Sequence, residues 1–358
     1  MKVKLEDVCE RGTSNLKQSD IAKTSGDYPI YGASGYIGNT NFYHQEKPYV
    51  AVVKDGAGVG RAALYPANSS VIGTMQYLLP KDNVLPKYLF YVVSYMHLEK
   101  YFTGATIPHI YFKDYKNEEF NLDLLERQAE IVEILEKCEK IIEKRKQEIQ
   151  LLDQLIKARF VEMFGNPVLN DKGWEQKSLG EITTKIGSGA TPKGGKEAYQ
   201  EEGITLIRSM NVHNGQFEYK DLAHISDEQA SKLDNVTIEE DDVLLNITGA
   251  SVARSCVVPN EILPARVNQH VCIIRCKDCI IPEFLNKLLI DDNYQDLLWS
   301  IAGSGATRES ITKQQVENLQ IILPMLELQK EFMAFCHQVT KSKLFEFSSL
   351  QNHTGMLQ

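Results

Sequence analysis

The sequence contains a motif that returns 201 residues later, which indicates two related folded units in one chain. "GATIPHI" occupies residues 104–110 and "GATRESI" occupies residues 305–311, and matching residues continue without gaps up to Phe332. Two shorter pairs also match, "KDGAGVGR" with "NITGASVAR" and "VKLEDV" with "KSLGEI". Their smaller offsets, 193 and 174 residues, indicate that the second copy carries insertions. A chain of 358 residues is long enough for two hydrophobic cores.

Each copy has the pattern of a mixed α/β domain. Short apolar runs bounded by Gly, Asn and Ser indicate strands. Helical patterns lie between them, at residues 86–102 and 281–301. We therefore predict an α/β (mixed α+β) fold with two globular domains. The expected strands include residues 49–53, 75–80, 241–247 and 270–275.

A long amphipathic helix is predicted between the two copies. Asp123 and Glu126 fit a capping box at its start, and Gly165 suits its end. Such a helix measures about 60 Å. An apolar position recurs every seven residues along it, which is the pattern of a coiled coil. The stripe consists of Ile131, Leu135, Cys138, Ile142, Ile149, Leu152, Ile156 and Met163.

A rod this long needs a partner helix to cover its stripe, and the end of the second copy supplies one. Phe332, Phe335 and Val339 provide apolar positions there. We favour an antiparallel coiled coil with one globular domain at each end; the alternative is that each helix closes only its own domain. The tail "SSLQNHTGMLQ" loses the stripe. The expected boundaries are 1–120 for the first domain, 121–165 for the central helix, 166–325 for the second domain and 326–358 for a shorter distal helix.

Charge and cysteine content narrow the function classes. The net charge is −9 and is concentrated in residues 166–325, so a DNA-binding chain would have to place its Lys and Arg on one face. Seven cysteines with irregular spacing favour reduced thiols. Cys272, Cys276 and Cys279 lie near His270 but lack paired C-x-x-C spacing, so we expect core cysteines and no metal. No apolar run approaches 18 residues, and we expect a cytoplasmic protein.

Catalytic motifs are weak or missing, so we expect no catalytic residue. "DGAGVGR" has three glycines, but "AALY" continues as a strand where a cofactor loop needs a helix. "GNPVL" superficially resembles the Asn-Pro-Pro-aromatic motif of adenine methyltransferases, yet lacks the second proline and the aromatic residue. The sequence has no Walker A lysine motif, no H-E-x-x-H and no G-x-S-x-G.

Taken as a whole, the chain resembles the specificity subunit of type I restriction–modification systems. The resemblance rests on the order of domains and helices, and on "LLERQAEIVEIL", "MLELQKEFMAF", "ARFVEMFGNP", "GWEQKSLGEI", "ITLIRSMNV", "RVNQHVCIIR" and "GATRESI". It implies two target recognition domains that each read half of a split DNA sequence, and a helical pair that fixes the gap. It also implies a subunit without catalytic chemistry or cofactor of its own.

The same resemblance implies specific partners. Two methyltransferase subunits would use S-adenosylmethionine to modify adenine at N6, and restriction subunits would use ATP and Mg²⁺. Double-stranded DNA would be the ligand, and no membrane would be involved. Two rival functions remain. One is a coiled-coil scaffold without a DNA target. The other is a self-sufficient methyltransferase, and the missing cofactor motifs disfavour this second function.

Residues for DNA contact are expected on loops, where Arg, Lys, Asn, Gln, Ser and Thr reach base edges and phosphates. Taken singly, each candidate also suits a turn or a solvated surface. The repeated Thr106 and Thr307 favour a shared structural or phosphate role, and sequence specificity is expected in the unmatched insertions. In the first copy the candidates are Ser34, Tyr36, Lys54, Arg61, Gln76, Thr106 and His109. In the second copy they are Ser188, Thr191, Lys193, Lys196, Arg208, Ser209, Asn211, Thr248, Ser251, Arg254, Asn268, Gln269, His270, Thr307 and Arg308.

Overall fold

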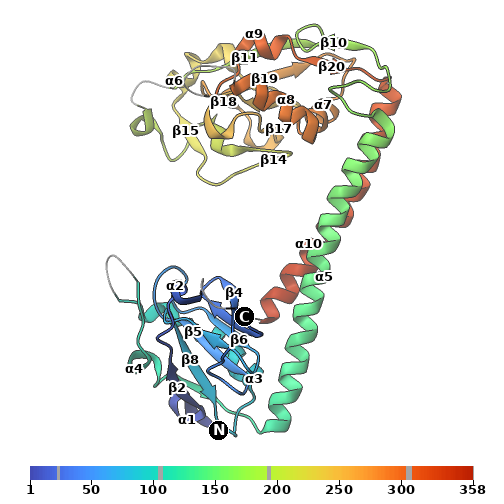
Figure 1. The fold of residues 1–358 in the computed structure, drawn as a ribbon. Helices are drawn as coiled ribbons and strands as arrows, with labels where there is room; N and C mark the ends of the chain where they lie inside the picture. Colours follow the sequence, from blue (N-terminus) through green and yellow to red (C-terminus); the bar gives the residue numbers. More distant parts are fainter. Residues whose placement is uncertain (22–24, 104–107, 192–194, 304–308, 358) are drawn as a thin grey trace. The chain divides into compact units, whose positions relative to one another are not determined.

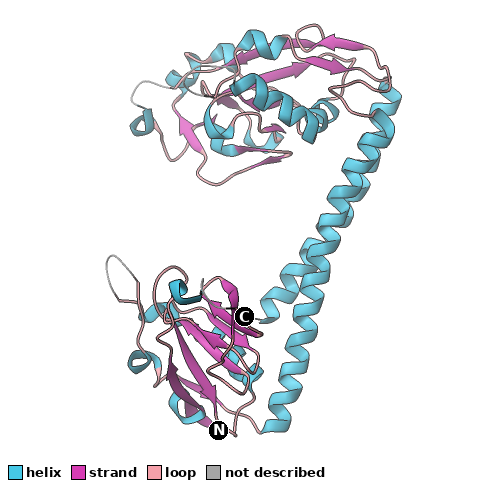
Figure 2. Ribbon diagram, in the orientation of Figure 1, coloured by secondary structure: helices cyan, strands magenta, loops and turns pink. Residues whose placement is uncertain are grey.

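The chain folds as two compact units. The computed structural model describes residues 1–21, 25–103, 108–191, 195–303 and 309–357. Unit 1 contains residues 1–146 and 349–358, and unit 2 contains residues 147–348. Each unit combines helices with β-sheets, as Figures 1 and 2 show. The predicted mixed α/β fold is confirmed.

Unit 1 is built on a four-stranded antiparallel sheet with the order β2-β8-β5-β6. All five residues of β5 (Tyr49–Val53) are buried, because the strand lies inside the sheet and under a helix. A second sheet has the order β4-β3-β7, with β7 parallel to β3. The other strands of these sheets are β2 Cys9–Thr13, β3 Tyr28–Gly32, β4 Gly35–Thr40, β6 Ala62–Tyr65, β7 Ser70–Val71 and β8 Met75–Pro80.

Unit 2 repeats this topology. Its four-stranded antiparallel sheet has the order β11-β19-β16-β17, and its second sheet has the order β15-β12-β18, with β18 parallel to β12. The register repeats as well, since Val50 faces Leu78 in unit 1 and Val243 faces Ile274 in unit 2. The internal repeat is therefore a structural repeat. The strands are β11 Thr183–Ser188, β12 Ile204–Ile207, β15 Ala223–Ile225, β16 Val243–Asn246, β17 Ser255–Val257, β18 Ala265–Val267 and β19 Val271–Cys276.

Equivalent helices cover equivalent strands in the two units. α3 (Pro86–Tyr95) packs on β5 and β6, and α7 (Pro282–Leu289) packs on β16 and β17. Both begin with a proline, which suits a first helical turn because its missing N–H would have no partner there. Neither predicted helix continues unbroken. His97 takes a left-handed conformation before a short 3₁₀ helix, η1 (Leu98–Tyr101), and α7 is followed by a separate helix, α8 (Asp292–Gly303).

Short elements complete both units. The pair β1 and β9 in unit 1 corresponds to the pair β10 and β20 in unit 2, and β9 and β20 lead into the two long helices. The bounds are β1 Lys2–Lys4, α1 Leu5–Val8, α2 Gln18–Ile21, α4 Phe112–Tyr115, β9 Glu119–Asn121, β10 Gln176–Ser178, η2 Gly195–Ala198, η3 Ser209–Asn211, β13 Val212–His213, β14 Gln216–Phe217, α6 Asp227–Ser231, η4 Asp234–Val236, η5 Gly249–Ser251, η6 Asn260–Ile262, α9 Lys313–Glu317 and β20 Gln320–Ile322.

The two long helices are α5 (Leu125–Phe164) and α10 (Leu326–Leu357). α5 starts two residues after Asp123, whose carboxylate accepts a hydrogen bond from the Tyr88 hydroxyl at 3.2 Å instead of belonging to the expected capping box. The helix ends before Gly165, which has a φ of +74°. Glycine adopts this conformation at little cost, so the predicted stop is confirmed.

Within unit 2 the two helices run antiparallel. Asp153 pairs with Lys343 at 2.5 Å, and Arg159 pairs with Glu331 at 2.9 Å. On α10, Phe332 and Val339 are buried and Phe335 is half-buried. The stripe of α5 is half-buried at each predicted position, from Ile131, Leu135, Cys138 and Ile142 in unit 1 to Ile149, Leu152, Ile156 and Met163 in unit 2.

The ends of the helices also belong to domain cores. Ile131 packs against the core of unit 1, and Ile156 and Met163 pack against the core of unit 2. The most buried positions of α5 are two aromatic residues that the heptad count did not select, Phe160 and Phe164, with 3% and 0% exposure. Pairing of the helices and closure of domain cores therefore occur together.

The cysteines are only partly as expected. Cys272 is buried and Cys276 is half-buried, and burial raises the pKa of both thiols to about 12. Cys279 is exposed, because β19 ends at Cys276, so the prediction of a core position was wrong there. Among the described residues, no three His, Cys, Asp or Glu side chains are grouped to hold a metal ion. None of the helices in the described part of the chain has the length and apolar content needed to cross a membrane.

Candidate nucleic-acid interface

In unit 2, several predicted contact residues gather at one end of the four-stranded sheet. Because neighbouring strands are antiparallel, the ends of β11 and β16 lie beside the starts of β19 and β17. Ser188 closes β11, Thr248 follows β16, Arg254 precedes β17 and His270 precedes β19. We call this the loop end of unit 2.

A chain of hydrogen bonds orders part of this loop end. His270 lies between two partners: its Nδ1 bonds the Thr248 hydroxyl, and its Nε2 lies 3.0 Å from Nε2 of Gln269. The hydroxyl of Thr191 in turn donates to Oε1 of Gln269. Gln269 and Thr191 are exposed, so this network presents amide and hydroxyl groups to solvent in one arrangement. Such groups recognise base edges by hydrogen bonding.

Two arginines flank the network with different degrees of restraint. Arg254 is half-buried, and its guanidinium has no hydrogen-bond or ion-pair partner among the described residues. Arg208 lies over the ring of Tyr199 at 5.3 Å and donates to the carbonyl of Asp221, while its Nε has no partner in the described structure. The carbonyl of Ser209 accepts from Asn246, which holds this loop against β16. Ser251 is half-buried at the end of η5.

Unit 1 has an equivalent loop end. Lys54 follows β5, and Arg61 precedes β6, as Thr248 and Arg254 flank β16 and β17. The intervening turn is glycine-rich because three positions, Gly56, Gly58 and Gly60, have φ between +83° and +88°. A Cβ on Gly60 would come within 2.3 Å of the Glu99 nitrogen, so this glycine has a structural role.

The β3–β4 hairpin joins the loop end of unit 1. Nη2 of Arg61 donates to the carbonyl of Ala33 at 3.1 Å, beside the exposed Ser34. Tyr36 is 61% exposed on the same hairpin, and Lys54 is paired with Asp55 at 3.6 Å.

His109 also reaches the loop end of unit 1. It pairs through its backbone with both Asp55 and Thr103, and its ring packs edge-on against Tyr111 at 4.9 Å. In unit 2 the matching bridge joins Thr248 to Ser310, so the second-last residue of the repeated motif is attached to the same strand end in both units.

Three predicted contact residues are buried and used inside the fold. Gln76 is 4% exposed and accepts from the Tyr115 hydroxyl at 3.0 Å. Asn211 is fully buried and donates to the carbonyls of Glu218 and Lys220. Asn268 is 6% exposed and accepts from the backbone of His270 at 3.0 Å. Their assignment to DNA contact is corrected to a structural one, since these bonds stabilise buried amides that would otherwise be unsatisfied.

Thr106, Lys193, Thr307 and Arg308 lie outside the described residues. Lys196 lies in η2, but its side chain is outside the described part of the structure. Contact of the repeated threonines, Thr106 and Thr307, with phosphate therefore stays a prediction.

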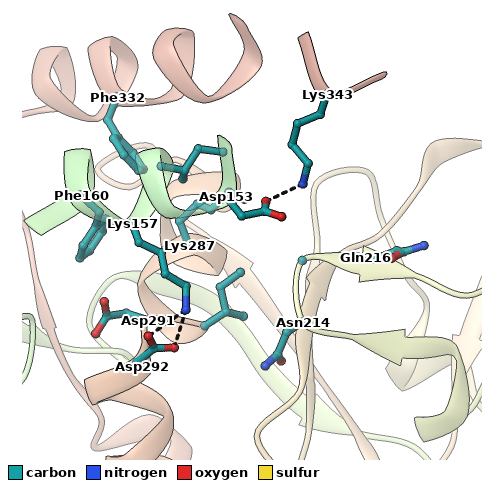
Figure 3. A pocket seen from close by; sticks show the side chains of 13 residues that line it. Asp153, Lys157, Phe160, Asn214, Gln216, Lys287, Asp291, Asp292, Phe332 and Lys343 are labelled. Carbon is teal, nitrogen blue, oxygen red and sulfur yellow. Dashed lines mark hydrogen bonds and ion pairs between the residues drawn. The ribbon is translucent and has the colours of Figure 1, made fainter. Parts of the chain in front are cut away.

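A separate pocket of about 490 Å³ lies in unit 2 beside the helical pair (Figure 3). Phe160 and Phe332 line it, and Asn214 and Gln216 approach from the β13–β14 hairpin. Lys157 bonds both carboxylate oxygens of Asp292 at 2.8 Å, and Lys343 bonds Asp153. The charges of these side chains are paired with one another, and the arrangement contains no nucleophile with an adjacent base.

Comparison with known proteins assigns the fold to a family. A model described as "Type I restriction modification DNA specificity domain" matches residues 1–152 and 171–347. The chain belongs to this family. The type I restriction enzyme MjaIX specificity subunit of Methanocaldococcus jannaschii is 25% identical over 278 residues, which cover 71% of this chain and 62% of that protein. The match thus spans less than two thirds of that relative's length.

Solved structures share the fold of the whole chain. The type I restriction-modification S subunit from M. genitalium aligns with a TM-score of 0.61 and 15% identity, over 100% of this chain and 93% of that one. A chain from a structure on complex assembly and conformational transition of the type I R-M system aligns with a TM-score of 0.63 and 18% identity, over 100% and 95%. The family is thus supported by both sequence and fold.

Sequence reasoning missed two sets of residues in this family member. Phe160 and Phe164 pack against Phe284 and Phe332 with ring centroids 5.0 to 6.1 Å apart. Their signal was the aromatic pair four residues apart in "ARFVEMFGNP". The other set is Gln128 with its repeat partner Gln329, both fully buried, whose signal was an identical polar residue at one place in both copies.

Proposed function

We propose that the chain is the DNA-specificity subunit of a type I restriction–modification complex and that each unit reads one half of a split DNA site. The observation that carries this proposal is a shared framework with different loop residues. Gln269 and His270 precede β19, whereas Gly73 and Thr74 precede the equivalent strand β8. Two readers of different sequences need the same framework but different groups for base contact.

The loop ends offer both classes of DNA contact. Arg254, Arg61 and Lys54 suit phosphates, because cations bind the backbone independently of sequence. Gln269 suits a base edge, since an amide can bond adenine through two atoms. The negative charge of the whole chain is compatible with this role because contact requires cations only on the face that meets DNA.

The spacer is proposed to act as a ruler. In this proposal residues 1–120 and 166–325 are the two target recognition domains, and residues 121–165 and 326–358 are the spacer helices. A helix of 40 residues is about 60 Å long, which corresponds to at most about 18 base pairs between the centres of the two readers. Readers set in from the helix ends would recognise half-sites one to two helical turns apart.

The chain is proposed to supply specificity and no chemistry. Two methyltransferase subunits would dock on the helical pair and modify adenine at N6 with S-adenosylmethionine, and restriction subunits would supply ATP- and Mg²⁺-dependent cleavage. Support comes from the family match and from a structural relative whose description concerns complex assembly of the type I R-M system.

The decisive experiment maps methylated adenines in DNA from cells that carry the chain and its methyltransferase partners. We expect one split sequence with a fixed gap, and no methylation when either component is omitted. Methyl transfer by the purified chain alone would instead establish a self-sufficient methyltransferase. A chain that binds duplex DNA without preference for a split sequence, at any salt concentration, would support the scaffold alternative.

The ruler is tested separately by lengthening the spacer. Insertion of seven residues after Ile149, with a matching insertion in α10, adds about two helical turns, or about 10 Å. The gap is expected to grow by about three base pairs while both half-sites stay the same. An altered half-site, or a gap that stays the same, would refute the ruler assignment.

A further inference from the structure

Two glutamines occupy the same place at the start of the two long helices. Gln128 lies in the first turn of α5, and Gln329 lies in the first turn of α10, 201 residues later. Both side chains are completely buried, with 0% exposure. A buried amide destabilises a fold unless its oxygen and its N–H groups find partners, so the groups that these amides contact are informative.

Gln128 makes three hydrogen bonds to backbone atoms. Its Oε1 accepts from the backbone N–H of Leu85 at 2.8 Å. Its Nε2 donates to the carbonyl of Asn83 at 2.9 Å and to the carbonyl of Asp123 at 2.8 Å. Both amide hydrogens and one oxygen lone pair are therefore used.

Gln329 makes the same three bonds in unit 2. Its Oε1 accepts from the backbone N–H of Ile281 at 2.9 Å. Its Nε2 donates to the carbonyls of Cys279 and Pro324 at 3.2 and 2.9 Å. Each partner occupies the position of its counterpart in unit 1, although the residue types have diverged. The arrangement of bonds has persisted while the residues around it changed.

These bonds join three parts of each unit. They connect the first turn of the long helix, the residue two positions before that helix, and the loop that enters α3 or α7. α3 packs on β5 and β6, and α7 packs on β16 and β17. Those strands carry the loop ends described above. Each glutamine thus ties a long helix to the layer that supports the candidate DNA contacts of the same unit.

The direction in which a long helix leaves its unit has a large effect at its far end. A tilt of about 10° at the base of a helix about 60 Å long displaces the other end by about 10 Å, or about three base-pair steps. Apolar packing alone is weakly directional and tolerates small rotations. Hydrogen bonds weaken steeply when their angles change, so a set of three restricts the tilt.

We infer that Gln128 and Gln329 are positioning residues that fix the direction of each spacer helix on its recognition unit and thereby set the gap between the two half-sites. The inference rests on the proposed function as a reader of split DNA. The glutamines act through the helices and do not contact DNA. Their removal is expected to reduce the preference of the complex for one gap length, while the recognised sequence of each half-site stays unchanged.

The test uses the full chain assembled with its methyltransferase partners. Gln128→Met keeps a straight side chain of similar length and removes all three hydrogen bonds. Binding is measured to duplexes that carry both half-sites at the native gap, at one base pair less and at one base pair more. We expect affinity at the native gap to fall about tenfold, with little change at the other two gaps, so the gap preference falls about tenfold. The penalty for a mutated half-site is expected to stay the same.

Two control variants separate positioning from general destabilisation. Gln154→Met makes the same substitution at an exposed position of α5 and is expected to change nothing. Val93→Ala truncates a fully buried side chain in the core of unit 1 without touching the joint, so any loss of binding should be equal at all gaps. Gln128→Met that lowers binding equally at all gaps, as Val93→Ala does, would overturn the inference.

Two further variants keep the test decisive if Gln128→Met fails to assemble. Gln329→Met removes the same bonds at the other joint and is expected to reduce the gap preference to a similar extent. Gln128→Asn keeps the amide but shortens the side chain by one methylene, and should give an intermediate profile. An unchanged gap profile in both variants contradicts the inference. A wild-type complex without any split target would instead contradict the proposed function.

Discussion

The two units keep one strand order but exchange polar and apolar residues at equivalent positions. In unit 2, Asp242 is fully buried and accepts two hydrogen bonds at 2.8 Å from Arg275. The same pair of positions in unit 1 holds Tyr49 and Leu79, which belong to one hydrophobic cluster and form no ion pair. The shared strand order therefore depends on the buried strands. It is compatible with either a buried ion pair or a pair of hydrophobic side chains at these two positions.

The reverse exchange occurs next to the last strand of each unit. Glu118 precedes β9 and pairs with Lys100 at 2.6 Å, whereas the equivalent Leu319 precedes β20 and is buried in the core of unit 2. The units differ also in how the long helix is covered. Phe160 and Phe164 cover Phe332 in unit 2, while Ile131, at the position of Phe332, lines a groove of about 510 Å³ with Tyr91, Tyr95, Leu135 and Glu139 in unit 1.

The largest expected effect comes from the aromatic cluster of unit 2. Phe164→Ala should lower the free energy of unfolding by about 3–5 kcal/mol, because it leaves a cavity among Phe160, Phe284 and Phe332. Urea unfolding followed by tryptophan fluorescence measures this in unit 2, which contains both tryptophans, Trp174 and Trp299.

A matched control lies on the same helix. Val161→Ala truncates an apolar side chain that is 49% exposed and should change the free energy of unfolding by at most about 0.5 kcal/mol. Equal losses of unfolding free energy for Phe164→Ala and Val161→Ala would contradict the conclusion that the buried aromatic face of α5 stabilises unit 2 more than its exposed face does.

The next effect tests the exchange of Asp242 and Arg275 for Tyr49 and Leu79. Arg275→Leu leaves the Asp242 carboxylate buried without its main partner and should cost about 3 kcal/mol of unfolding free energy in unit 2. The double variant Asp242→Tyr with Arg275→Leu installs the residues of unit 1 and should recover most of that loss. Tryptophan-monitored urea unfolding measures both. A double variant no more stable than Arg275→Leu would show that the two units do not accept each other's pair.

The sequence predicted the framework better than it predicted the joints. Residues 49–53 form β5 with the expected bounds, because a short buried strand is an unbroken apolar run. The break after α3 was missed, because His97 takes its left-handed conformation through its surroundings and carries no Gly or Pro signal. Phe160 and Phe164 were missed because the seven-residue count follows a single stripe of α5, and these two residues lie outside that stripe, where they pack against both Phe332 of α10 and Phe284 of the domain core.

For the candidate interface, the sequence separated loops from strands but not exposed amides from buried ones. The repeat located three cations correctly, because matching positions in the two copies flank equivalent strands. These cations are Lys54, Arg61 and Arg254. Gln76 and Asn211 carry the same chemistry, yet their amides bond atoms inside the fold. The sequence shows the same Asn or Gln whether its amide recognises a base or bonds a buried carbonyl. Only the three-dimensional contacts distinguish the two roles.

A smaller effect compares the equivalent arginines of the two loop ends. Arg254 has no partner among the described residues, whereas Arg61 donates to the carbonyls of Ala33 and Gly58. Arg254→Ala should weaken binding to the split target about tenfold and reduce the salt dependence by about one phosphate contact. Arg61→Ala should weaken it less, about threefold, because part of its hydrogen-bonding capacity serves the hairpin. Titrations at several salt concentrations measure both.

The matched control for the arginines is Lys330→Ala on α10, an exposed cation away from the loop ends. It should leave the affinity and salt dependence of the purified chain unchanged. An equal loss for Lys330→Ala and Arg254→Ala would mean that only the total charge matters, and the loop ends would lose their assignment as the contact surface.

The smallest effect concerns the ion pair that unit 1 has in place of Leu319. The Lys100 ammonium, together with the Tyr101 hydroxyl, holds the pKa of the Glu118 carboxyl below its usual range. A lowered folded-state pKa stabilises the fold above the unfolded pKa of about 4.3, and this contribution is lost as the pH falls through the folded-state pKa. Because Glu118 is partly exposed, Glu118→Gln should cost at most about 1 kcal/mol at pH 7, and the difference from wild type should disappear as the pH falls through the lowered folded-state pKa of Glu118. Hydrogen exchange of residues 98–121, corrected for intrinsic rates, measures this locally, with Glu10→Gln on β2 as a control without a charged partner among the described residues. A Glu118→Gln difference that stays constant down to a pH at which the carboxyl is protonated in the fold would show that the side chain stabilises unit 1 through packing, as Leu319 does in unit 2, and not through its charge.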